Sequence, residues 1–110
     1  QGYRYQTAFR RAPWPTWTYT CGEAVLEKRL FLVQGENTAV VEYELLEGEG
    51  VLELRPFTAF RDHHHLQQRG AAAPRLGFDA GMVKLLPATD GLPELFLGHN
   101  AETVLETGDW

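Results

Sequence analysis

The sequence contains a single cysteine, Cys21, among its 110 residues. One cysteine cannot form a disulfide within the chain, and proteins of reducing compartments rarely rely on disulfides. We therefore expect a protein that folds without covalent cross-links, and we expect it in the cytoplasm. Common zinc-site motifs are missing as well, because the sequence contains no C-x-x-C and no H-E-x-x-H.

Basic residues are outnumbered, with 10 lysines and arginines against 15 aspartates and glutamates and a formal net charge of -5. A protein without a basic field does not attract phosphate backbones, so we expect no nucleic-acid partner and no anionic membrane surface. No apolar run approaches the roughly 20 residues that span a bilayer, and no charged-then-apolar signal pattern opens the sequence. The sequence therefore predicts neither a nucleic-acid-binding nor a membrane protein.

The length and composition fit one globular domain. At 110 residues and 44% apolar composition the chain is long enough for one core and too short for two domains. We therefore expect residues 1–110 to form a single domain. Neither end carries an obvious terminal structure, so we also expect this domain to be a piece of a longer protein.

Alternation of apolar and polar residues is the dominant pattern, and it is typical of β-strands with one solvent-facing side. Residues 23–34 are apolar on both faces, which indicates a central strand covered on both sides, although a helix can also be drawn through this run. Gly-rich turns at 35–37 and 48–50 join neighbouring strands as antiparallel hairpins. The predicted strands are residues 3–11, 16–20, 23–34, 38–46, 51–55, 82–86, 94–97 and 103–106.

The prolines and glycines between these strands mark connectors. Two prolines make residues 12–15 an extended connector, Pro56 stops the strand at 51–55, and residues 67–74 have no periodicity and form a loop. Short strands at such spacing predict an all-β antiparallel sandwich built largely as a meander.

Three consecutive histidines, His63, His64 and His65, suggest a metal site at first sight. On a strand, however, His63 and His65 point to one face and His64 to the other, so at most two share a site. A zinc site needs three or four protein ligands, and His99 is the only other histidine. We expect no metal and no cofactor; a cupin-like metalloenzyme that uses His63 and His65 is the alternative.

The neighbouring residues Arg61, Asp62 and His64 suit a fixed hydrogen-bond network. Asp62 and His64 project to the same face of an extended chain, where a carboxylate holds an imidazole in one tautomer, while Arg61 suits a bidentate bond to another carboxylate. Such a network orients a loop or lines a polar pocket. These three residues are candidates for a domain interface or for ligand binding.

Aromatic residues give a second candidate set. Trp14 and Trp17, with Tyr5 and Tyr19, can provide flat faces on which sugar rings stack; the alternative is that they are half-buried sheet residues. Lys28 lies among leucines, where its ammonium group needs an acidic partner or a route to solvent, and it marks a candidate domain contact.

Acidic residues are numerous enough to suggest the paired carboxylates of a glycoside hydrolase. Glu42 and Glu44, however, alternate with apolar residues along one strand and therefore lie on its solvent-facing side. We interpret them as a solvated face of the sheet.

Four separated motifs occur in one order along the chain: P-T-W around Trp17, L-E-K around Lys28, G-x-N-T at residues 35–38, and R-P followed by R-D-x-H from Arg55 to His64. Over residues 2–110 the sequence resembles the N-terminal domain of bacterial and archaeal glycogen debranching enzymes of the amylo-α-1,6-glucosidase type. One departure is His63, where that family more often has an aromatic residue.

This resemblance implies a β-sandwich of the super-sandwich type that precedes an (α/α)6 catalytic toroid in the parent enzyme. It implies that the present chain is not catalytic by itself, that its partner is that toroid, and that α-glucan is a candidate ligand. The first strands of the sandwich are expected to be missing here, so self-association through unpaired strand edges is also expected. A free-standing carbohydrate-binding module is the alternative.

Overall fold

The computed structural model describes residues 2–61, 64–66 and 73–107. All pairings between strands are antiparallel, and they form two sheets, so the predicted all-β class is confirmed. No helix among the described residues is long and apolar enough to span a bilayer. The elements are a 3-10 turn η1 (Gly2–Tyr5) and the strands β1 (Gln6–Arg10), β2 (Thr16–Cys21), β3 (Ala24–Leu32), β4 (Ala39–Glu47), β5 (Arg75–Asp79), β6 (Met82–Leu86) and β7 (Leu95–Gly98).

The chain divides into two compact units, Gln1–Leu54 and Arg55–Trp110, called unit 1 and unit 2 here. Unit 1 holds the sheet β1-β2-β3-β4, and unit 2 holds the sheet β5-β6-β7. The expectation that residues 1–110 form a single domain stays a prediction.

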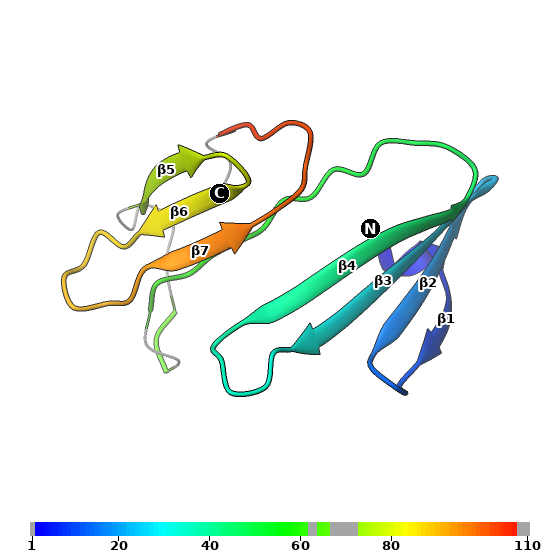
Figure 1. Ribbon diagram of the computed structural model, residues 1–110, viewed down its shortest axis with the longest axis horizontal. Helices are drawn as coiled ribbons and strands as arrows, with labels where there is room; N and C mark the ends of the chain where they lie inside the picture. The colour runs from blue at the N-terminus through cyan, green and yellow to red at the C-terminus, as the bar shows by residue number, and fades with distance from the viewer. Residues whose placement is uncertain (1, 62–63, 67–72, 108–110) are drawn as a thin grey trace. The chain divides into compact units, whose positions relative to one another are not determined.

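In unit 1 each strand pairs with its neighbours in sequence, and Figure 1 shows β1 to β4 side by side. The central position predicted for residues 23–34 is confirmed, because β3 pairs with both β2 and β4, and the helical alternative for this run is wrong. The first strand begins at Gln6 and not at residue 3, since Gly2–Tyr5 form a 3-10 turn. Gly22 makes the β2–β3 turn at φ 62°, a conformation that glycine adopts at little cost.

The register gives the unit 1 sheet two different faces. Lys28 stands opposite Trp17 on β2 and Tyr43 on β4, whereas Arg29 stands opposite Thr16 and Glu42. The two side-chain sets alternate along each strand, so one face is almost entirely apolar and the other is charged. The apolar face consists of Phe9, Trp17, Tyr19, Leu26, Lys28, Leu30, Leu32, Val41, Tyr43 and Leu45, and the charged face includes Arg10, Glu27, Arg29, Glu42 and Glu44.

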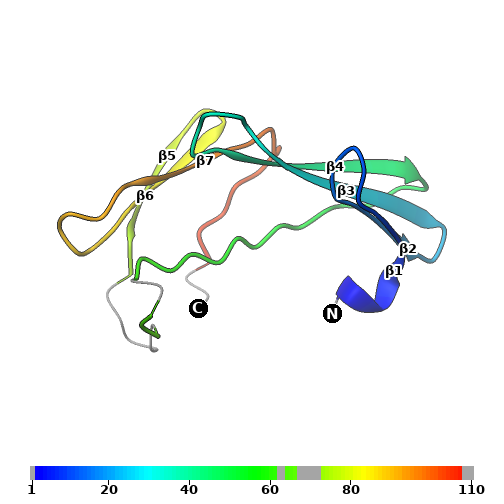
Figure 2. The same ribbon diagram turned by 90° about the horizontal axis from the view of Figure 1, so that it is seen from below.

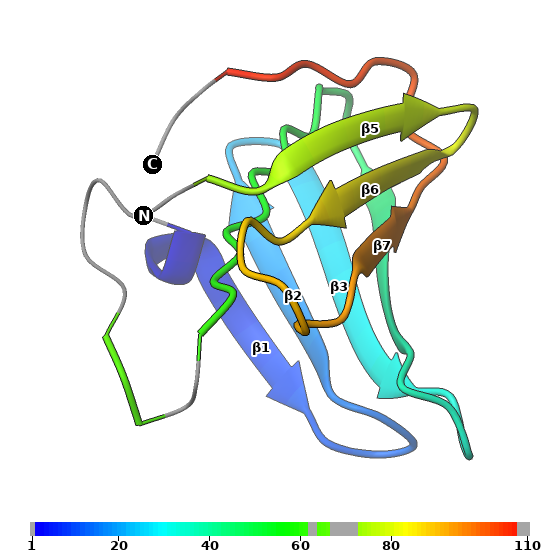
Figure 3. The same cartoon turned by 90° about the vertical axis from the view of Figure 1, so that its left-hand side faces the viewer.

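In unit 2 the central strand is β6, which lies between β5 and β7 (Figure 3). Leu85 on β6 is the only buried hydrophobic side chain among the described residues, at 5% exposed. One face of this sheet carries no charged residue, because the partners of Val83 and Leu85 are apolar on both sides. Its members are Leu76, Phe78, Val83, Leu85, Leu95 and Leu97.

Two predicted strands are wrong, and one strand was not predicted. Residues 51–55 and 103–106 form no strand, and Figure 2 shows the chain after β4 running on without a strand arrow. Leu52 and Leu54 alternate with polar residues, but this stretch forms no strand, and Val51 just before it is 98% exposed. Conversely, the sequence did not predict β5, which Pro74 precedes and Gly77 interrupts.

Candidate functional site

Lys28 is the single charged residue on the apolar face of unit 1. Its Nζ lies 5.3 Å from the ring centroid of Trp17 and 6.0 Å from that of Tyr43. Phe9 packs against Trp17 from the neighbouring strand, with ring centroids 5.3 Å apart. Aromatic faces attract a cation, so the two rings hold the ammonium group in the middle of an apolar surface.

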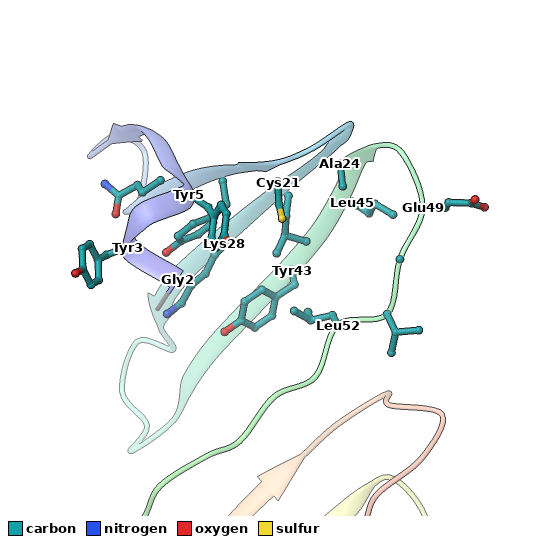
Figure 4. A pocket seen from close by; sticks show the side chains of 15 residues that line it. Gly2, Tyr3, Tyr5, Cys21, Ala24, Lys28, Tyr43, Leu45, Glu49 and Leu52 are labelled. Atoms are coloured by element: carbon teal, nitrogen blue, oxygen red, sulfur yellow. The ribbon is translucent and has the colours of Figure 1, made fainter.

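A groove with a volume of about 660 Å³ lies over this part of the face. Strands β2 to β4 provide its floor, whereas η1 and the segment after β4 provide its walls. Figure 4 shows Lys28 and Tyr43 in this groove and Glu49 pointing away from it. The lining includes four tyrosines and the half-buried lysine: Tyr3, Tyr5, Tyr19, Tyr43 and Lys28.

Burial on the apolar face changes the acidity of Tyr43. Loss of solvent, followed by the proximity of Tyr19, raises the pKa of Tyr43 above its ordinary value of 10.0. The phenol therefore stays protonated in the folded protein at a pH at which it ionises in the unfolded chain.

This shift predicts a loss of stability in alkaline solution. Below pH 10.0 Tyr43 is protonated in both states, but above it the unfolded chain loses the proton first, so folding becomes less favourable. We expect the denaturant midpoint to fall between about pH 9 and about pH 11, and to fall less in Tyr43→Phe. The control Tyr3→Phe should keep the full drop. An equal drop in Tyr43→Phe and wild type would contradict the assignment.

The charged face is organised around Arg29. Its guanidinium bonds to Glu44, lies 2.9 Å from Glu27 and lies 3.9 Å from Glu42. Arg10 reaches the same Glu27 carboxylate at 3.2 Å. The bonds to Glu44 and then Glu27 raise the pKa of Arg29 above its usual value. Arg29 thus weakens the repulsion among three carboxylates that lie close to one another across the strands.

Replacing Arg29 by glutamine leaves Glu27, Glu42 and Glu44 as neighbouring like charges. We expect a lower thermal midpoint at low salt, and we expect about 1 M salt to remove most of the difference, because the Debye length is then about 3 Å. The matched control is Arg11→Gln, which removes an exposed arginine just outside β1 and should change little. A deficit that persists undiminished in high salt would point to lost packing instead of charge repulsion.

The structure places the three predicted site residues of unit 1 on two faces. Trp17 and Lys28 lie together on the apolar face. Trp14 instead packs on Phe31, with ring centroids 5.5 Å apart, and Phe31 alternates with the apolar-face residues of β3. The two indoles therefore do not share one surface. The roles proposed for these residues stay predictions.

The remaining predicted residues belong to unit 2. Arg61 and His64 are exposed, and Arg61 donates a hydrogen bond to the backbone oxygen of His65. Asp62 and His63 lie outside the described residues, so the network predicted for Arg61, Asp62 and His64 stays a prediction. Within the described ranges, no group of three or more His, Cys, Asp or Glu side chains is arranged to hold a metal ion.

Sequence reasoning missed the part that Tyr43 plays in this site. The sequence contained the signal, because each residue before the turn of an antiparallel hairpin pairs with the residue the same number of positions after it. Starting from the pair Leu32 and Ala39 beside the turn, four steps in each direction lead to Lys28 and Tyr43. The register of the β3–β4 hairpin therefore predicts the contact between them.

A family model described as glycogen debranching enzyme N terminal matches residues 1–110. No curated protein and no solved structure matches the chain.

Proposed function

The chain belongs to the glycogen debranching enzyme N-terminal family, and from this premise we propose that it is a non-catalytic domain that supports the catalytic domain of its parent enzyme. The parent is an amylo-α-1,6-glucosidase, a cytoplasmic glycoside hydrolase whose acid and base lie in an (α/α)6 toroid. The present chain is a β-sandwich of the super-sandwich type that packs against this toroid. The single cysteine, Cys21, is in keeping with the cytoplasm.

The observation that carries the proposal is the apolar face of unit 1. Leu32 is 76% exposed and Phe9 is 52% exposed, and Val41 and Leu45 on β4 are exposed as well. Monomeric proteins rarely leave such contiguous apolar surface in water, and large patches of this kind mark protein interfaces. A face formed by four strands suits a broad protein surface better than it suits a small ligand.

The carboxylates of the charged face support a non-catalytic role. A glycosidase needs one carboxyl group to donate a proton and a second one to attack or to activate water. Glu27, Glu42 and Glu44 all lie within 4.0 Å of the Arg29 guanidinium. These acids are engaged in holding the strands together and face away from the groove.

The experiment compares three proteins: this chain, the parent enzyme, and the parent enzyme without the segment. Glucose release from a branched α-glucan is measured for each. We expect release by the parent enzyme alone, since the chain lacks the acid and base, and the shortened enzyme loses the surface that the domain covers. Glucose release by this chain on its own would overturn the proposal.

A second candidate is a carbohydrate-binding module, and the tyrosine-lined groove favours it. Flat aromatic rings with hydroxyl groups suit the apolar faces and hydroxyls of sugars. Under this candidate, calorimetric titration of the chain with malto-oligosaccharides shows binding that Tyr43→Ala, in the lining of the groove, weakens. Trp14→Ala, on the opposite face, is the matched control. Absence of any heat of binding removes this candidate and leaves the first one in place.

The edge strands of unit 1 support one further part of the proposal. β1 and β4 each pair on one side only in the strand order. An unpaired edge is a template for another strand, so we propose that the isolated chain self-associates through these edges. Sedimentation over a range of concentrations tests this.

A further inference from the structure

We propose that Lys28 is one half of an ion pair, and that a carboxylate on the rest of the parent enzyme provides the other half when it covers the apolar face. This inference rests on the proposed function and names the chemistry of the docking partner. The partner surface is apolar and carries one aspartate or glutamate positioned opposite the groove.

The first support is the surroundings of Lys28. Its ammonium group lies over Trp17 and Tyr43 and has no ion-pair partner among the described residues of unit 1. Glu49 also lines the groove, but its side chain points away (Figure 4). Lys28 is half-buried already, and covering the face would remove its remaining water. Burying an ammonium group without an acidic partner has a large unfavourable free energy.

Unit 2 provides an internal comparison. The Nζ of Lys84 lies 5.5 Å from the ring centroid of Phe96, much as that of Lys28 lies over Trp17. Lys84, however, also has a carboxylate, with Glu94 Oε2 at 2.7 Å. Each lysine thus lies on a strand beside an aromatic ring of a neighbouring strand. Among the described residues, only Lys84 has an acidic partner within its own unit.

The acid for Lys28 is not offered by the apolar face of unit 2. That face consists of Leu76, Phe78, Val83, Leu85, Leu95 and Leu97 and carries no charge. A cover made of such residues alone would bury the ammonium group unpaired. We place the partner carboxylate in the part of the parent enzyme outside residues 1–110, and the cross-linking test distinguishes it from the carboxylates on other parts of unit 2.

The primary test is zero-length carbodiimide cross-linking of the full-length parent enzyme, followed by mass spectrometry. The reagent joins an amine to a carboxylate only when they are in contact. We expect Lys28 to be joined to an aspartate or glutamate outside residues 1–110. The pair Lys84 and Glu94, at 2.7 Å, is the positive control within the same molecule.

The second measurement is the thermal midpoint of the parent enzyme with Lys28→Met and with Lys84→Met. Lys28→Met leaves the partner carboxylate buried without a counter-charge, so we expect the thermal midpoint to fall by at least about 5 °C at neutral pH. This decrease in the thermal midpoint should become smaller as the pH falls to about 4, where the unpaired acid is protonated and neutral. Lys84→Met leaves Glu94 partly in water and should cost little.

Several outcomes overturn the inference. A cross-link from Lys28 to residues 55–110, or to a second copy of this chain, would show that a different surface covers the apolar face. The ion pair is ruled out if Lys84 is cross-linked to Glu94 and Lys28 is not cross-linked. It is also ruled out if Lys28→Met lowers the thermal midpoint equally at neutral and at acidic pH. Tight binding of a malto-oligosaccharide in the groove of the parent enzyme makes it a sugar site instead. The proposed function is decided separately, by the glucose-release comparison.

Discussion

Replacing Gly48 by alanine is expected to lower the free energy of unfolding by about 2 to 5 kcal/mol, from a left-handed backbone penalty of about 1 to 2 and an overpacking cost of about 1 to 3. Gly48 directly follows β4 and has φ 78°, and a Cβ there would lie 2.9 Å from Ala24 Cα and 2.9 Å from Glu23 O. Both atoms are backbone at the start of β3, so the hairpin itself has to shift.

Gly35→Ala is the matched control for this substitution. Gly35 has a similar φ of 82°, but a Cβ there meets nothing within 4 Å. We therefore expect only the backbone penalty of about 1 to 2 kcal/mol. Urea unfolding followed by circular dichroism measures both variants. Equal losses for the two would show that the contact with the β3 backbone costs nothing.

Replacing Leu85 by alanine is expected to cost about 2 to 4 kcal/mol in unit 2. Leu85 is 5% exposed and pairs with Leu76 on β5 and Leu95 on β7, so it joins all three strands. Few other side chains can compensate, because no other hydrophobic side chain among the described residues is buried.

The control for Leu85→Ala is Leu66→Ala in the same unit. Leu66 is 87% exposed, so its truncation should change stability by no more than about 0.5 kcal/mol. Amide hydrogen exchange in β5, β6 and β7 provides the readout, and we expect protection to fall in Leu85→Ala alone. Unchanged protection in that variant would show that Leu85 does not hold the sheet together.

The long hairpin of unit 1 was predictable from the sequence because two signals agree there. Residues 38–46 alternate cleanly, and the Gly35 turn fixes how they pair with the preceding strand. The opposed faces were harder to predict, since residues 23–34 are apolar on both sides. The Glu27 and Arg29 positions became interpretable only through their ion pairs with neighbouring strands.

The failures share one physical cause. Alternation shows which side chains of an extended chain point the same way, but it does not provide a neighbour to pair with. Leu52 and Leu54 alternate with polar residues and yet lie on exposed chain that forms no strand. In β5 the opposite holds, because pairing with β6 makes a strand of residues whose glycine and preceding proline disfavour one.

The candidate site was predicted in part. The sequence shows Lys28 among leucines, which is unusual for a charged residue. Its need for an acidic partner follows because removing a charged group from water costs free energy. That Trp17 and Tyr43 hold it, and that Trp14 lies on the other face, depends on strand register. The predicted Arg61 network includes Asp62, which is outside the described residues, so it stays a prediction.

The most direct test of the docking face is hydroxyl-radical footprinting of the isolated chain and of the full parent enzyme. Leu32 and Phe9, at 76% and 52% exposed, should be labelled readily in the isolated chain. In the parent enzyme we predict that their labelling falls several-fold, while Trp14 on the opposite face keeps its rate. Equal labelling of Leu32 and Phe9 in both proteins would contradict the claim that the apolar face of unit 1 docks onto the rest of the enzyme.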